Sequence, residues 1–219
     1  MLELGQPMSQ HGINSLTFNY QGTHQSEGTY SLRNTLKDIQ AAIEYLHQDD
    51  VINEFKIDTG RLILGGYSYG GGMALAYAAS HPEINRIVSI AGTDHGEFAR
   101  EYIRNSTFAE MIDASFEEMK FPAGPVHFGG KEVIPKLTQD PDPYDLRLSA
   151  VALANRDILL IGGWDDPNVS IEHHILPLYR ALVASNALRV RVIAFQDDHA
   201  FEKSRGELAH IVADWILSV

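Results

Sequence analysis

A serine stands between glycines in the segment G-Y-S-Y-G at residues 66–70. The mostly apolar run 61–64 before it predicts a buried strand, and the segment 70–76 after it predicts a helix. A strand, a G-x-S-x-G turn and a helix form a nucleophile elbow, in which the serine takes up a strained backbone conformation. We therefore expect Ser68 Oγ to attack an electrophilic carbon and the N–H of Tyr69 to point at the developing oxyanion.

Two acids follow a predicted strand further along the chain. Asp165 and Asp166 come directly after the apolar run 157–161 and two glycines. Open α/β sheets collect ligands and chemistry at the carboxyl ends of their strands. A serine needs a histidine to take its proton and a carboxylate to orient that histidine. Either aspartate is a candidate for this acid, and the competing interpretation is a turn that carries two solvated carboxylates.

The chain has ten histidines, of which His199 has the best position for a general base. It lies in a loop between the predicted strand 189–195 and the last predicted helix. His173, His174 and His210 fall within predicted helices and are expected on the surface. The other six lie in loops or at helix ends without a paired acid. A lone histidine is most often structural. The interpretation of His199 as a base therefore depends on its position after Ser68 and the two aspartates, each at the end of a predicted strand.

Predicted strands and helices alternate along the chain with short links. This alternation predicts a single α/β domain over 1–219, with a parallel sheet of about five strands and helices on both faces. An amphipathic helix is predicted between the first and second strands. The expected strands are 15–20, 61–64, 84–90, 157–161 and 189–195.

The segment 94–155 interrupts this alternation. Its aromatic and aliphatic residues have helical spacing over 98–103 and 108–116, which predicts two helices with an apolar face. Long insertions between strands are often lids or binding elements, so we expect 94–155 to be a lid-like helical insertion that shapes substrate access. The alternative is that its aromatic side chains only pack against the rest of the domain.

Composition excludes several classes of function. The formal net charge of −12 argues against binding to a phosphate backbone, so no nucleic-acid partner is expected. The absence of cysteine excludes disulfides, thiolate nucleophiles and cysteine-ligated metals. No apolar run is long enough for a membrane span, and the first residues lack the pattern of a signal peptide. We therefore expect a cytoplasmic protein with no membrane partner.

The order of serine, acid and histidine resembles that of the α/β-hydrolases. G-Y-S-Y-G-G at 66–71 resembles the elbow of prolyl-oligopeptidase-like hydrolases, and D-H-A-F at 198–201 resembles the histidine loop of dienelactone-hydrolase-like enzymes. The segment 160–169 resembles the acid turn G-x-x-D-x-x-V of the first group. Its glycine and valine set the register so that Asp166 matches the acid, and Asp165 is the alternative acid.

This resemblance implies a serine hydrolase that cleaves carboxylic esters through an acyl-enzyme. Ser68 would be the nucleophile, His199 the base, Asp166 the orienting acid and Tyr69 the oxyanion donor. The expected partner is a small-molecule ester, and no metal or organic cofactor is implied. The S-Y-G-G elbow keeps open a peptidase or aminoacyl hydrolase as an alternative. A non-catalytic scaffold or binding protein with a degenerate hydrolase fold is another alternative.

The N-terminus departs from the family pattern. Residues 1–12 resemble the helix that in the family follows three strands and an oxyanion loop, so we expect an N-terminally truncated form of the fold, whether fragment, shortened reading frame or reduced version. The oxyanion hole would then keep only the Tyr69 donor. We expect the segment 16–20 to pair directly with 61–64, or a strand of another chain to fill the slot. Direct pairing, the simpler arrangement, would leave a sheet edge that begins at Leu16 and through which copies of the chain can associate.

Overall fold

The structure is a computed structural model, which describes residues 2–128 and 133–218. The chain forms two compact units. Unit 1 comprises Met1–Leu16, Leu46–Thr93 and Leu146–Val219, and unit 2 comprises Thr17–Tyr45 and Asp94–Asp145. All five candidate site residues lie in unit 1.

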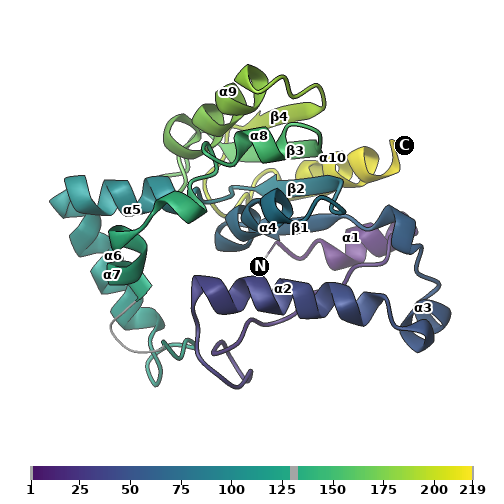
Figure 1. The fold of residues 1–219 in the computed structure, drawn as a ribbon, viewed down its shortest axis with the longest axis horizontal. Helices are drawn as coiled ribbons and strands as arrows, with labels where there is room; N and C mark the ends of the chain where they lie inside the picture. The colour runs from purple at the N-terminus through teal and green to yellow at the C-terminus, as the bar shows by residue number, and fades with distance from the viewer. Residues whose placement is uncertain (1, 129–132, 219) are drawn as a thin grey trace. The chain divides into compact units, whose positions relative to one another are not determined.

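Unit 1 is built on a parallel sheet (Figure 1). The two central strands are buried almost throughout, whereas the two edge strands are partly exposed. This difference is the expected one for a parallel sheet that is covered on both faces. Within the described residues, the strands lie in the order β1 (Leu64–Tyr67), β2 (Arg86–Ile90), β3 (Asp157–Gly163) and β4 (Val190–Phe195).

Alternate residues of the central strands are buried on opposite faces of the sheet. On one face, Val88 and Leu159 join a core with Met8 of α1 (Gly5–Gln10) and Leu208 of α10 (Arg205–Leu217). Residues on the opposite face, such as Ile158, are equally buried. Helix α4 (Tyr69–Ser80) packs against β1 and β2, and α9 (Leu176–Ala184) packs against β4. Unit 1 therefore has helices on both faces of its sheet, as the alternation in the sequence predicts.

The other elements of unit 1 are short. Helix α1 packs against α10, and α8 packs against α4 and α9. Of the histidines expected on helix surfaces, His173 and His210 are exposed, but His174 is buried, because its face of the π-helical turn is turned inward with Ile171 and Ile175. These short elements are α3 (Asp49–Phe55), the 3₁₀ turn η1 (Thr59–Arg61), α8 (Ala150–Leu153) and the π-helical turn η3 (Ile171–Ile175).

The described residues form a sheet of four strands, where about five were expected. The segment 15–20 has the composition of a strand but joins no strand ladder in the described chain, and Leu16 and Phe18 remain 43% and 41% exposed. The predicted direct pairing of 16–20 with the nucleophile strand is therefore wrong. Strand propensity reflects packing on a sheet surface, so composition alone does not create a partner.

The nucleophile strand begins later than its apolar run suggests. Residues 59–61 form η1, where the Asp58 side chain accepts a hydrogen bond from Gly60 N, and β1 starts only at Leu64. β1 lies at the edge of the sheet formed by the described residues. Whether another chain pairs with this edge stays a prediction.

Unit 2 contains the helices predicted for the insertion. Spacing of apolar residues correctly predicts α5 (His95–Arg104) and α6 (Ser106–Met119), and Phe98 and Phe108 pack edge-to-face between them. Ion pairs of Arg100 with Asp142 and Asp145 hold α5 to the segment 142–145, which follows α6 and α7 in the sequence. Unit 2 also contains most of α2 (Leu32–Leu46), together with α7 (Val133–Gln139) and the 3₁₀ turn η2 (Asp142–Tyr144).

The described part of 94–155 is divided between the units, because 146–155 with α8 belongs to unit 1. Its interpretation as a lid stays a prediction. Across the described residues, each helix is too short or too polar to cross a membrane.

Gly66 is expected to be essential to the fold. A Cβ atom at this position would overlap with backbone atoms of Gly70 and Gly71 at the start of α4. Because backbone cannot move aside as a flexible side chain can, Gly66→Ala should destabilise the protein by about 3 kcal/mol. Gly206→Ala is the matched control, since a Cβ there meets nothing within 4 Å, and it should change stability by less than about 1 kcal/mol. Denaturant unfolding measures both, and equal stabilities of the two variants would contradict the close contact.

Candidate active site

The strand register brings the candidate residues to one edge of the sheet. Tyr67 at the end of β1 pairs with Ile90, which pairs in turn with Ile161 of β3. Gly163 at the end of β3 pairs with Phe195 at the end of β4. The nucleophile, acid and base candidates each follow one of these strand ends. Three segments that lie far apart in the sequence thus meet at the carboxyl edge of the sheet.

Ser68 has the backbone conformation of a nucleophile elbow. Its φ is 54° and its ψ is −121°, which is an unfavourable combination for a residue with a side chain. Hydrogen bonds fix this backbone, since Ser68 N donates to Ile90 O at 2.8 Å and Ser68 O accepts from Thr93 N at 3.1 Å and Gly71 N at 3.0 Å. The turn therefore holds the serine between β1 and α4, as the glycine-rich motif predicts.

Ser68, His199 and Asp166 form a continuous chain of hydrogen bonds. His199 Nε2 lies 2.9 Å from Ser68 Oγ, and His199 Nδ1 lies 2.6 Å from Asp166 Oδ2. The Asp166 side chain is fully buried, whereas the His199 side chain is 21% exposed. In this geometry the carboxylate accepts from Nδ1, which leaves Nε2 to accept the serine proton.

Asp166 is held in its ionised form by its surroundings. Burial alone would raise the pKa of this carboxyl. Hydrogen bonds from His199 and from the Val169 and Asn168 amides outweigh burial and lower its pKa below the ordinary value. An ionised carboxylate at this point stabilises the imidazolium that forms when His199 takes a proton.

Asp165, the alternative acid, makes no hydrogen bond to His199 within the described residues. It is exposed, and its two carboxylate oxygens both accept from Gln196 Nε2 at 2.9 Å. Its backbone N donates to Asp197 O. The structure therefore brings Asp166 to the histidine and leaves Asp165 at the surface, in the register that the acid-turn motif favours.

Tyr69 is the first residue of α4 and follows the nucleophile directly. The N-terminal end of a helix carries a partial positive charge, which favours negative charge close by. This position suits an oxyanion donor, and the role of its N–H stays a prediction.

Asp197 supports the site and was not among the residues predicted to do so. It is buried, and its carboxylate accepts from Ser204 Oγ and from the amides of Asp198, Lys203 and Ser204. Burial would raise its pKa, but these four donors outweigh burial and lower it. Asp197 thus fixes the loop that carries His199 onto the start of α10. The only available signal was its place two residues before a candidate base.

Gly163 lets this histidine loop approach the acid turn. A Cβ atom at Gly163 would overlap with the carbonyl oxygens of Asp197 and Asp198. The same glycine fixes the register of the acid-turn motif in the sequence. Close approach of two loops is therefore the physical reason for a glycine at this point.

Comparison with protein families agrees with this geometry. Residues 3–117, just over half of the chain, match the model of the X-Pro dipeptidyl-peptidase (S15 family). The chain belongs to the S15 family. A comparison of the S15-family chain with curated protein sequences gives no match.

Solved structures share the fold of this S15-family chain at low sequence identity. Paleococcus ferrophilus monoacylglycerol lipase is 17% identical with a TM-score of 0.64, over 99% of this chain and 88% of that one. The Pyrococcus furiosus esterase Pf2001 is 17% identical with a TM-score of 0.67, over 97% and 72%. Porphyromonas gingivalis dipeptidyl peptidase 4 is 18% identical with a TM-score of 0.58, over 84% and 22%. These similarities establish an α/β-hydrolase fold.

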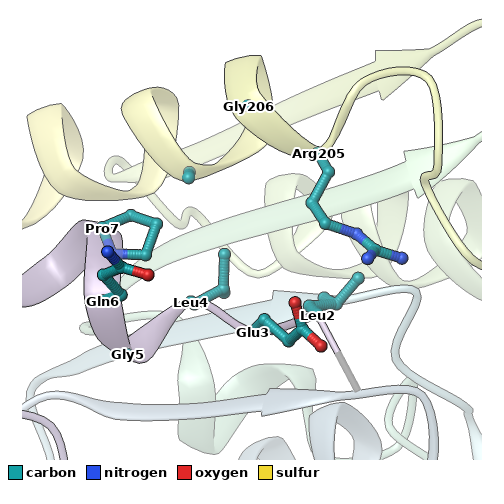
Figure 2. A pocket seen from close by; sticks show the side chains of 9 residues that line it. Leu2, Glu3, Leu4, Gly5, Gln6, Pro7, Arg205 and Gly206 are labelled. Carbon is teal, nitrogen blue, oxygen red and sulfur yellow. The ribbon is translucent and has the colours of Figure 1, made fainter.

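A hollow of about 590 Å³ is lined by the segment 2–7 together with Arg205, Gly206 and Ala209. Figure 2 shows Arg205 on one side of it and the segment 2–7 on the other. The Arg205 Nη2 donates to Ala200 O at 3.3 Å, so the hollow adjoins the segment after His199. None of Ser68, Asp166 and His199 lines it. In the part of this S15-family chain that the structure describes, no three acidic or histidine side chains gather as metal ligands.

Asp197→Asn should destabilise the protein by about 3 kcal/mol. The amide would turn N–H groups toward donors that now meet a carboxylate, and hydrogen bonds to a charged group are worth about 1.5–3 kcal/mol each. Asp198→Asn is the matched control, because Asp198 is exposed and, within the described residues, its side chain accepts a hydrogen bond only from Ala200 N. It should cost less than about 1 kcal/mol in denaturant unfolding. Similar losses in both variants would show that Asp197 does not hold the loop.

The lowered pKa values of Asp166 and Asp197 also predict an acid-sensitive fold. Their contribution to the free energy of unfolding is complete above the unfolded-state pKa of about 3.9 and is lost as the pH falls toward the lower folded values. Stability measured by denaturant between about pH 5 and pH 2 should therefore fall less steeply in Asp197→Asn than in the wild type. Parallel curves would contradict a depressed pKa at this residue.

Proposed function

We propose that the chain is a serine hydrolase that cleaves carboxylic esters. Ser68 is the nucleophile, His199 the general base, Asp166 the orienting acid, and the N–H of Tyr69 an oxyanion donor. The observation that carries the proposal is the hydrogen-bonded chain of Ser68 Oγ, His199 and Asp166, with distances of 2.9 and 2.6 Å. The neighbouring esterase and lipase folds support a hydrolase without defining its substrate.

In acylation, Ser68 Oγ attacks the carbonyl carbon of the ester while His199 Nε2 takes its proton. The carbonyl oxygen becomes an oxyanion beside the start of α4, where the N–H of Tyr69 stabilises it. The tetrahedral intermediate then collapses, and the bond to the leaving alkoxide breaks. His199 returns its proton to that oxygen, so the alcohol leaves and an acyl-serine remains.

In deacylation, water repeats the same steps on the acyl-serine. His199 takes a proton from water as its oxygen attacks the acyl carbon. The second tetrahedral intermediate expels Ser68 Oγ, to which His199 returns the proton. The carboxylic acid leaves, and the resting enzyme is restored. Asp166 stabilises the imidazolium in both halves of the cycle, because its carboxylate stays ionised beside Nδ1.

Esters fit this site better than amides on chemical grounds. An alkoxide is a better leaving group than an amide anion, so the nitrogen of an amide must be protonated as its bond to the acyl carbon breaks. Ester cleavage therefore demands less of the oxyanion site and of the histidine. Tyr69 is the one oxyanion donor that the elbow motif itself supplies.

A second candidate is peptidase activity on X-Pro peptides, which the match of residues 3–117 to the S15 family favours. Both activities use the same three side chains and differ in the leaving group. Turnover of p-nitrophenyl esters compared with X-Pro anilides separates them. Ester turnover alone supports the esterase, and efficient cleavage of the anilides supports the peptidase. A folded chain that cleaves neither would favour a non-catalytic binding protein.

Ser68→Ala should abolish ester hydrolysis while the protein stays folded. Loss of the nucleophile from a triad costs on the order of 10⁶ in kcat. The elbow is maintained by backbone hydrogen bonds and by Gly66, so the hydroxyl contributes little to stability. Turnover of p-nitrophenyl acetate with circular dichroism as the folding control measures both effects. A folded variant with near wild-type turnover would refute the serine mechanism.

The two neighbouring aspartates provide a matched pair of variants. Asp166→Asn should lower kcat by up to about 10⁴-fold, because the amide favours the wrong histidine tautomer. Asp165→Asn should change kcat less than about threefold, since Asp165 is exposed and bonds to Gln196. Steady-state kinetics on the same ester compare them directly, and the reverse ranking would assign the orienting role to Asp165.

A further inference from the structure

Tyr67, the residue before the candidate nucleophile, also contacts the candidate base. Its hydroxyl donates to the backbone oxygen of His199 at 2.7 Å, across 132 positions of the sequence. Its ring lies against the imidazole, with centroids 5.1 Å apart and planes inclined by 35°. One side chain therefore touches both the backbone and the ring of His199.

We propose that Tyr67 is a positioning residue that fixes His199 relative to Ser68. The inference rests on the proposed function, because it assigns Tyr67 a role in proton transfer between those two residues. Tyr67 and Ser68 are adjacent in the chain, so the rigid elbow backbone determines where the phenol can reach. The hydroxyl holds the His199 backbone, and the ring limits rotation of the imidazole. The positions of His199 and Ser68 are thus both determined by the same short piece of elbow backbone.

The other anchors of the histidine loop do not replace this contact. Asp197 secures the loop to the start of α10, through Lys203 and Ser204. Arg205 Nη2 bonds to Ala200 O at the long distance of 3.3 Å. Both connect the loop to the following helix and not to the elbow. Within the described residues, it is the Tyr67 hydroxyl that holds the backbone oxygen of His199.

The phenol is suited to a permanent donor. Burial, followed by the carboxylates of Asp166 and Asp198, raises the pKa of Tyr67, and Arg205 opposes them only in part. The hydroxyl therefore keeps its proton at the pH values at which a histidine base works. A misplacement of about 1 Å between reacting groups can cost about 10²-fold in rate, so a lost anchor should appear in the chemical step.

Tyr67→Phe tests the hydroxyl while keeping the ring and the packing. We expect kcat for a p-nitrophenyl ester to fall about tenfold, with KM within twofold of the wild type and a melting temperature within a few degrees. Tyr67→Leu, which also removes the ring, should lose more. Tyr45→Phe is the control, because Tyr45 is an exposed tyrosine of α2, and its kinetics should match the wild type. Purely structural damage would lower the melting temperature without this split between kcat and KM.

Hydrogen exchange separates failure of this inference from failure of the proposed function. Amide exchange of the peptide 196–201 should be at least threefold faster in Tyr67→Phe than in the wild type or Tyr45→Phe. If the wild type hydrolyses esters but Tyr67→Phe shows unchanged kcat and unchanged exchange, the inference is overturned and the proposed function stands. If the wild type has no Ser68-dependent hydrolysis, the proposed function fails, and faster loop exchange would still support the anchoring by Tyr67.

Discussion

The close contact of β1 with α4 is the constraint on which the rest of the site depends. Gly66 lets the backbone of α4 pass where any side chain would collide with it. Only with that contact can Ser68 be held at φ 54° and ψ −121° between the strand and the helix. The unfavourable conformation is stabilised by backbone hydrogen bonds to β2 and the segment after it, through Ile90 and Thr93. The direction of the serine hydroxyl therefore follows from backbone packing.

Two buried carboxylates then bring the other loops into position. Asp166 is surrounded by the donors of its own turn and of His199, while Asp197 gathers the amides at the start of α10. Several hydrogen bonds offset the free-energy cost of burying each of these ionised carboxylates. Gly163 allows the two loops to touch. The rim of the sheet is thus made rigid by polar contacts, while apolar side chains on both faces support the strands beneath it.

Much of the fold and of the candidate site could be predicted because the informative patterns are local. The glycines of the elbow, and a valine whose amide now donates to Asp166, act on neighbours within a few residues. The pairing partner of a strand is not a local property. The composition of 15–20 therefore predicted a strand that does not join the sheet. Asp197 was missed for the same reason, since its function appears only when Ser204 folds back to it. The contact of Tyr67 with His199 could not be predicted either, because it depends on how the ends of β1 and β4, which are not neighbours in the sheet, lie in space.

Active-site labelling with a fluorophosphonate, followed by peptide mass mapping, tests whether Ser68 and His199 act as nucleophile and base. The reagent reacts with a serine whose proton is removed by a neighbouring base, and does so without requiring knowledge of the natural substrate. We predict one adduct, on Ser68, that is strongly reduced when His199 is replaced by alanine. A folded wild-type protein that takes up no label, or that is labelled at another residue, would contradict the assignment of Ser68 and His199 as nucleophile and base.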